Sequence, residues 1–64
     1  MTNAVVKLVD DRWVVEADGT REYEGDDQIG ALVAAQRHLA SHGGGGLLIM
    51  DAAGRHLKRI VVDG

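Results

Sequence analysis

Histidine side chains are the groups in this 64-residue chain best suited to bind a metal. His38 and His42 are four residues apart, a spacing that places two imidazoles on one side of a helix, and His56 is a third candidate ligand. The sequence HLASH, however, lacks the glutamate base of the HExxH motif of zinc enzymes. Histidines near the negative end of a helix dipole are also common without any metal. We therefore expect no metal site.

Residues for nucleophilic catalysis are also scarce. Ser41 is the only serine, and its place in the last turn of the expected helix favours a hydrogen bond from its hydroxyl to a backbone carbonyl. The chain has no cysteine, which excludes a thiolate nucleophile, disulfides and thiolate zinc sites. The acid pairs Asp10–Asp11 and Asp26–Asp27 fall at an expected turn and a helix start, where exposed carboxylates are ordinary. We expect no catalytic activity and no cofactor.

The glycine run Gly43–Gly46 suggests a phosphate-binding loop, but its position contradicts that function. Phosphate loops run from a strand through glycines into a helix, so that the anion meets free backbone N–H groups. Here the expected helix precedes the glycines, and the groups facing them are carbonyls, which repel phosphate. We predict that Gly43 ends the helix in the left-handed conformation and that Gly44–Gly46 form a pliable link.

One basic cluster makes nucleic-acid binding the alternative functional hypothesis. Arg55, His56, Lys58 and Arg59 lie on an expected hairpin that could follow a phosphate backbone. Against this hypothesis, the net charge is −3, and the hairpin contains no aromatic residue to stack on bases.

Two strands and a tight turn begin the chain. A two-residue loop at Asp10–Asp11 joins AVVKLV to RWVVEA. The predicted cross-strand partners are Val9 with Arg12, Leu8 with Trp13, Val6 with Val15, and Ala4 with Ala17. DGTREYEG then predicts a third strand, for which a three-residue loop places Tyr23 beside Val15 in the core and a two-residue loop places it beside Val14. We favour the first because it avoids burying Glu22.

The hydrophobic period then becomes helical. Asp26 or Asp27 can cap a helix that ends at His42. Its broad apolar arc consists of Ile29, Leu32, Val33, Ala35, Leu39 and Ala40. Gln36 lies within this arc, and it marks either the rim of the buried face or a contact with another subunit.

A second hairpin, LLIM and RHLKRIVV around DAAG, ends the chain. We expect Leu47, Ile49 and Leu57 to face the helix. The candidates for the opposite face are Leu48, Met50, Ile60 and Val62, unless a bulge at Gly54 exchanges part of this assignment.

Together these elements predict an α+β fold, with residues 1–64 as one domain in the order β-β-β-α-β-β. A small antiparallel sheet of about five strands would pack on one helix. No stretch is long and apolar enough to span a membrane, and the amino terminus lacks the features of a signal peptide, so we expect a cytoplasmic protein.

Size and charge both favour association. At this length only about 60% of the unfolded surface is buried on folding, so a second copy would supply the missing burial. Residues 1–27 carry a net charge of −5 and residues 28–64 carry +2, which allows attraction across an interface. We therefore predict a protein-interaction module that forms a homodimer through its sheet faces or strand edges and could also bind another protein. The predicted interface residues are Val5, Val9, Val14, Met50 and Ile60.

Three stretches of the chain resemble a known family. RWVV, DQIGALVAA and LLIMDAAG are similar to the GWxV strand, the helix and the LxIxxxDG hairpin of the bacterial domain-of-unknown-function 2188 family. Arg12 replaces the glycine of the first motif, Asp27 stands in for a threonine, and Gly30 stands where a capping glutamate would be. The resemblance implies a small α+β domain and assigns no catalytic residue. A weaker similarity, of topology alone, is to the antitoxin half of HicA–HicB pairs, and it supports partner binding only by analogy.

Overall fold

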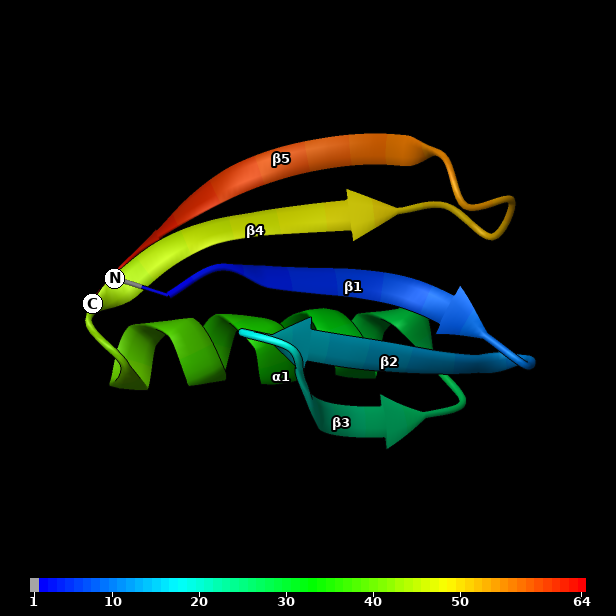
Figure 1. The fold of residues 1–64 in the computed structure, drawn as a ribbon, viewed down its shortest axis with the longest axis horizontal. Coiled ribbons are helices and arrows are strands. Elements are labelled where there is room, and N and C mark those ends of the chain that lie inside the picture. Colours follow the sequence, from blue (N-terminus) through cyan, green and yellow to red (C-terminus); the bar gives the residue numbers. More distant parts are fainter. Residues whose placement is uncertain (1) are drawn as a thin grey trace.

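The computed structural model describes residues 2–64, which form a five-stranded sheet with one helix on one face (Figure 1). The elements are β1 (Ala4–Val9), β2 (Arg12–Ala17), β3 (Thr20–Gly25), α1 (Gln28–Ser41), β4 (Gly44–Met50) and β5 (His56–Asp63). The strand order across the sheet is β3-β2-β1-β4-β5. The predicted fold class and element order are confirmed, with one difference: β4 runs parallel to β1. The sheet is therefore mixed, because the crossover through α1 returns the chain beside β1 in the same direction.

The β1–β2 hairpin has the register predicted from side-chain alternation. Val6 pairs with Val15 and Ala4 with Ala17, as expected for a two-residue loop. Both loop residues have positive φ, 50° at Asp10 and 64° at Asp11, as a type I′ turn requires. Aspartate tolerates this conformation better than most residues, which explains how the turn forms without glycine.

Tyr23 lies beside Val15 on the helix-covered face, as predicted, but the predicted three-residue loop is wrong. Asp18 and Gly19 form a two-residue turn with φ values of 52° and 81°. A bulge shifts the register between Val15 and Glu16, and Glu22 is the extra residue. The bulge thus turns Tyr23 into the core while Glu22 stays exposed.

Helix α1 begins at a capped end and packs on the sheet through two alanines and one leucine. The Asp27 carboxylate accepts a hydrogen bond from the Ile29 backbone N–H at 3.1 Å. Ala31, Ala35 and Leu39 are the buried residues of the helix. By contrast, Ile29 is 70% exposed, so the apolar arc of the helix is wider than the strip that the sheet covers.

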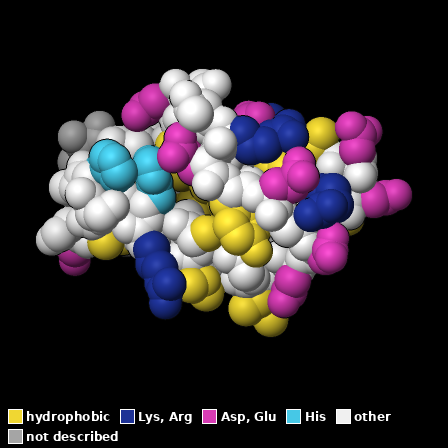
Figure 2. Space-filling model, turned by 90° about the horizontal axis from the view of Figure 1, so that it is seen from below, with side chains coloured by type: hydrophobic (Ala, Val, Ile, Leu, Met, Phe, Trp, Pro, Cys, Tyr) yellow, Lys and Arg dark blue, Asp and Glu magenta, His cyan; other side chains and the backbone are white. Residues whose placement is uncertain are grey.

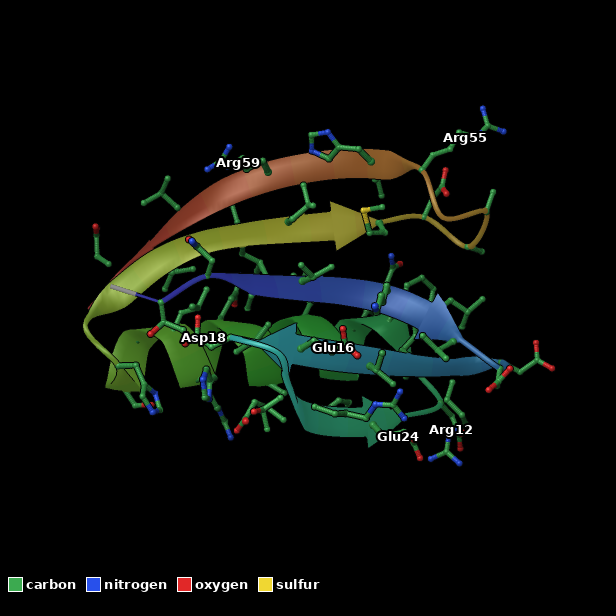
Figure 3. All side chains as sticks on the ribbon, in the orientation of Figure 1. Arg12, Glu16, Asp18, Glu24, Arg55 and Arg59 are labelled. Carbon is green, nitrogen blue, oxygen red and sulfur yellow. The ribbon has the colours of Figure 1, made fainter. Side chains whose placement is uncertain are left out.

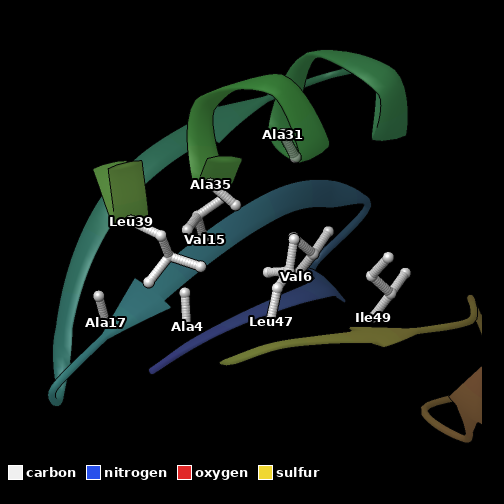
Figure 4. Close-up of a cluster of buried hydrophobic side chains, with 9 residues drawn as sticks. All are labelled: Ala4, Val6, Val15, Ala17, Ala31, Ala35, Leu39, Leu47 and Ile49. Atoms are coloured by element: carbon white, nitrogen blue, oxygen red, sulfur yellow. The ribbon is translucent and has the colours of Figure 1, made fainter. Parts of the chain in front are cut away.

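The core lies between α1 and the middle strands (Figure 4). Its buried members are Ala4, Val6, Val15, Ala17, Ala31, Ala35, Leu39, Leu47 and Ile49. Alanines on both sides of this interface let the helix backbone approach the sheet closely. Within residues 2–64, no helix has the length and apolar character needed to cross a bilayer.

The glycine run has two different structural roles. Gly43 has φ +84° directly after the helix cap, so the predicted helix stop is confirmed. The predicted pliable link is wrong, because Gly44–Gly46 are the first residues of β4. A Cβ on Gly45 would overlap the Thr2 carbonyl oxygen, and one on Gly44 would lie 2.5 Å from the Val62 carbonyl oxygen. These glycines therefore allow neighbouring backbone segments to approach β4 closely.

The assignment of Ile60 and Val62 to the face opposite the helix is wrong. Ile60 pairs with Leu47, a buried core residue on the helix side. Ile60 and Val62 both pack against this core. The register shifts between Ile49 and Met50, which leaves Leu57 as the extra residue of a bulge. A bulge at Gly54 was the stated condition for such an exchange of faces. The bulge instead lies at Leu57, three residues later.

The close approach at β4 predicts that Gly45→Ala lowers the free energy of unfolding by more than about 3 kcal/mol, because the added methyl displaces the backbone at Thr2. The matched control is Gly43→Ala, whose Cβ meets nothing within 4 Å, so only its positive φ costs stability, about 1 kcal/mol. Urea unfolding followed by circular dichroism measures both changes. Equal losses in the two variants would contradict the close-approach role of Gly45.

Candidate interaction surfaces

The sheet face turned away from α1, here called the open face, carries four of the five predicted interface residues. Val5, Val9 and Met50 are partly buried there, and Val14 is completely buried. Ile60 lies on the other face, under the edge of α1. The open face therefore exposes less apolar side-chain surface to solvent than the alternation of residues predicted.

Charged side chains cover Val14. Lys7 and Glu24 are its neighbours on β1 and β3, and Arg12 and Glu16 flank it on its own strand. Lys7 Nζ lies 2.8 Å from Glu16 Oε1, and Arg12 Nη2 lies 3.9 Å from Glu24 Oε1. Figure 3 shows Arg12, Glu16 and Glu24 projecting from β2 and β3. Because their aliphatic stems lie along the sheet, they exclude water from Val14 while their charged ends remain solvated.

These ion pairs extend to β3 and the start of α1. Arg21 Nη1 lies 3.1 Å from Glu24 Oε2, and Arg12 Nε lies 3.1 Å from Asp26 Oδ1. The pKa of Glu16 is held below its ordinary value, first by the hydrogen bond from Lys7 and then by the positive charges of Lys7 and Arg21, against some desolvation. In Figure 2, which views the molecule from below Figure 1, basic and acidic side chains interleave over part of the surface. The charged side chains on this half of the open face therefore already have ion-pair partners within one chain.

The other half of the open face is a shallow apolar hollow. Val5, Gly46 and Leu48 line it, with Asn3 and Arg59 at its margin. Its volume is about 200 Å³. The missing side chain of Gly46 deepens the hollow, so this part of the face remains available for a contact.

A second apolar surface, missed as an interface in the sequence, lies where α1 meets β5. Among residues 2–64, the large hydrophobic residues with exposed side chains are Ile29, Val33, Leu57 and Val61. The first three line the hollows between α1 and β5, whereas Val61 lies on β5 opposite Gly46 and so belongs to the open face. Hollows of about 470 and 350 Å³ lie between the helix and β5. We call this region the α1/β5 surface. Gln36 is exposed and lines the larger hollow, so it lies at the rim of the buried face, the first of its two predicted positions.

The histidines form a stacked pair at the end of α1. The ring centroids of His38 and His42 are 4.1 Å apart. His42 Nδ1 lies 2.7 Å from the His38 carbonyl oxygen, which can only accept, so this nitrogen must carry a hydrogen to form the bond. Within residues 2–64, no three histidine, aspartate or glutamate side chains are grouped to hold a metal.

The bulge in β3 brings a carboxylate to this pair that the sequence did not indicate. Glu22 Oε1 lies 3.7 Å from His38 Nδ1. Ser41, as predicted, donates its hydroxyl to a backbone carbonyl, that of His38, at 3.0 Å. Its oxygen also lies 3.1 Å from His42 Nδ1, the nitrogen already directed at a carbonyl. Ser41 therefore lacks a base oriented to take its proton, and the cluster lacks the geometry of a catalytic triad.

The basic side chains of the last hairpin are exposed but divided between faces. Lys58 is paired with Ile49 of the helix side, whereas Arg59 is paired with Leu48 of the open face. Figure 3 shows Arg55 at the hairpin turn and Arg59 further along β5. No ion pair within residues 2–64 involves Arg55, His56, Lys58 or Arg59. Because strand alternation separates them, they form a line along an edge and no continuous basic face.

The lowered pKa of Glu16 predicts a pH-dependent contribution to stability. A carboxyl group whose pKa is depressed in the folded state stabilises the fold above its unfolded pKa, and this contribution is lost as pH falls through the folded value. Lys7→Gln should therefore lower the urea midpoint at neutral pH, and the difference from the parent chain should disappear in acid, once Glu16 is protonated in the folded chain as well. A Lys7→Gln effect that persists undiminished in acid would contradict this electrostatic origin.

The chain matches no family model, no curated protein and no solved structure.

Proposed function

We propose that this chain is a non-catalytic protein-interaction or regulatory module that acts as a homodimer in a bacterial or phage cytoplasm. The observation that carries the proposal is that all exposed large hydrophobic side chains of the described residues lie on α1 and β5, beside the groove between them or at the edge strand. An apolar patch of this kind on a small chain usually marks an interface, because isolated chains hide such surface. Membership of the domain-of-unknown-function 2188 family, on the resemblance of RWVV and LLIMDAAG, is part of the proposal.

The small core supports the same proposal. Alanines make up four of the nine members of the core cluster, so the side-chain volume that stabilises one copy is low. Association would bury further apolar surface at about 25 cal/mol per Å² and so raise the stability of the folded chain. Val61 and Leu57 are 77% and 61% exposed, so β5 is an element whose apolar side chains association would bury.

Sedimentation equilibrium tests the homodimer. At tens of micromolar we expect a mass of twice the 6.8 kDa chain, with dissociation on dilution. Val61→Lys, which places a charge at the most exposed apolar position of β5, should weaken the dimer without unfolding the chain. Val14 is unsuitable for this test, because a charge there would be completely buried and would unfold the monomer. A monomeric mass throughout this concentration range would refute the homodimer.

Nucleic-acid binding remains a second candidate because Arg55, His56, Lys58 and Arg59 are all exposed. Fluorescence anisotropy with labelled single-stranded and duplex oligonucleotides at low salt tests it, since phosphate contacts are strongest there. We expect no saturable binding, because the basic side chains alternate between faces of a strand and lack an aromatic partner. Saturable binding that weakens with salt and is lost in Arg55→Ala with Lys58→Ala would favour this second function instead.

A further inference from the structure

We infer that the edge of β5 pairs with β5 of a second copy in antiparallel orientation, with Val61 at the two-fold axis. This inference rests on the proposed homodimer and specifies its surface and register. Such a pairing would join two sheets into one continuous sheet and would pair the backbone of residues 58–64 of one copy with the same residues of the other.

The two edges of the sheet differ in their suitability for pairing. The β3 edge contains a bulge at Glu22, and Arg21 and Glu24 are engaged in an ion pair with each other. Bulges and charges of this kind protect an edge against pairing. Strand β5 also has a bulge, at Leu57, but from Lys58 to Asp63 its pairing with β4 is regular, and Val61 is exposed in that stretch. Of the two edges, β5 is the less protected.

The sequence of β5 is complementary to itself. From Arg59 to Asp63 it reads RIVVD, with opposite charges flanking three apolar residues. When two copies run antiparallel about Val61, Arg59 of each faces Asp63 of the other. Neither residue has an ion-pair partner within residues 2–64 of its own chain. Opposite charges directly across a strand pair stabilise it, so the partner chain supplies what each chain lacks.

Side-chain alternation supports the same register. Arg59, Val61 and Asp63 lie opposite Leu48, Gly46 and Gly44, and so belong to the open face. A two-fold axis at Val61 pairs open-face residues with one another and places Ile60 opposite Val62 on the helix side. A register centred on Arg59 would oppose two guanidinium groups, which is unfavourable. A register centred on Ile60 forms no ion pair, because it places Arg59 opposite Val61.

The geometry also explains the exposure of Val61. This residue is 77% exposed in the single chain, the highest value among the exposed large hydrophobic residues of the described part. Its neighbour on β4 is Gly46, which has no side chain to cover it. At the two-fold axis, Val61 would pack against Val61 of the second copy, so the most exposed apolar residue becomes the centre of the interface.

A charge-swap cycle tests the inferred register. Arg59→Asp and Asp63→Arg each place like charges opposite one another at both ends of the pairing, and each should raise the dimer dissociation constant about tenfold. The double variant restores both attractions in reversed order and should recover the parent affinity. Circular dichroism verifies that the folds are unchanged. Equal effects of single and double variants would overturn the Arg59–Asp63 pairing.

Cysteine crosslinking tests the same axis independently, because the chain contains no cysteine. Val61→Cys should form a disulfide-linked dimer under mild oxidation, since antiparallel partners hold their Cα atoms about 5 Å apart. Leu57→Cys is the matched control on the same strand, 61% exposed but away from the axis, and should crosslink much more slowly. Faster crosslinking at Ile60→Cys than at Val61→Cys would overturn the register in favour of one centred on Ile60.

The outcomes separate the inference from the proposed function. A dimeric mass without the swap rescue and without preferential Val61→Cys crosslinking would overturn the β5 pairing and leave the homodimer intact. A monomer at all concentrations would overturn both. A mass that grows without limit as concentration rises would indicate head-to-tail pairing of β5 with β3, and would also overturn the closed dimer.

Discussion

The width of one helix is the constraint on which this structure depends. Five strands spaced about 4.8 Å apart span about 19 Å between the outer two, whereas a helix with its side chains is about 10 Å across. Helix α1 therefore covers only the middle of one sheet face. The outer strands and the opposite face must be shielded by their own side chains or remain exposed to solvent. Over β1 to β3, long charged side chains cover the open face and bury Val14. Along β5 no such cover exists within residues 2–64, and Leu57 and Val61 remain exposed.

The size of the core links folding to association. The helix approaches the sheet through Ala31 and Ala35, which gives close contact but little buried volume per residue. A chain built this way has a small margin of stability, so any partner that binds only the folded form raises its apparent stability by mass action. Association in such a protein serves both recognition and folding, and separating the two requires variants that change exposed residues alone.

Local patterns in the sequence predicted local structure well. The alternation around Asp10–Asp11 specified the first hairpin register completely, and the order of glycines after a helix correctly predicted the helix stop at Gly43. The failures were of two kinds, bulges within the hairpins β2–β3 and β4–β5, and contacts between distant segments. The bulge at Leu57, which places Ile60 on the helix side, leaves no mark in residue alternation. The need for glycine at Gly45 depends on the approach of Thr2, which no pattern near the glycine run reveals.

The candidate surfaces followed the same division. Alternation correctly placed Val5 and Met50 on the open face, but it could not show that side chains from three strands would close over Val14. The residues of the apolar arc of α1 were predicted from their spacing. Which of them the sheet leaves exposed, Ile29 and Val33, depends on where the helix axis crosses the sheet. The carboxylate of Glu22 beside His38 likewise depends on a bulge in β3.

The parallel pair at the centre of the sheet affects the order in which the chain can fold. Strand β1 lies between β2 and β4, and Ala4 pairs with Leu47, far along the chain. The first three strands can pair through tight turns, but the other side of β1 has no neighbour until β4 arrives. Parallel pairing over such a separation is slow, because the intervening chain must first be ordered. A folding chain therefore presents a temporary unpaired edge at the strand that becomes the most protected one.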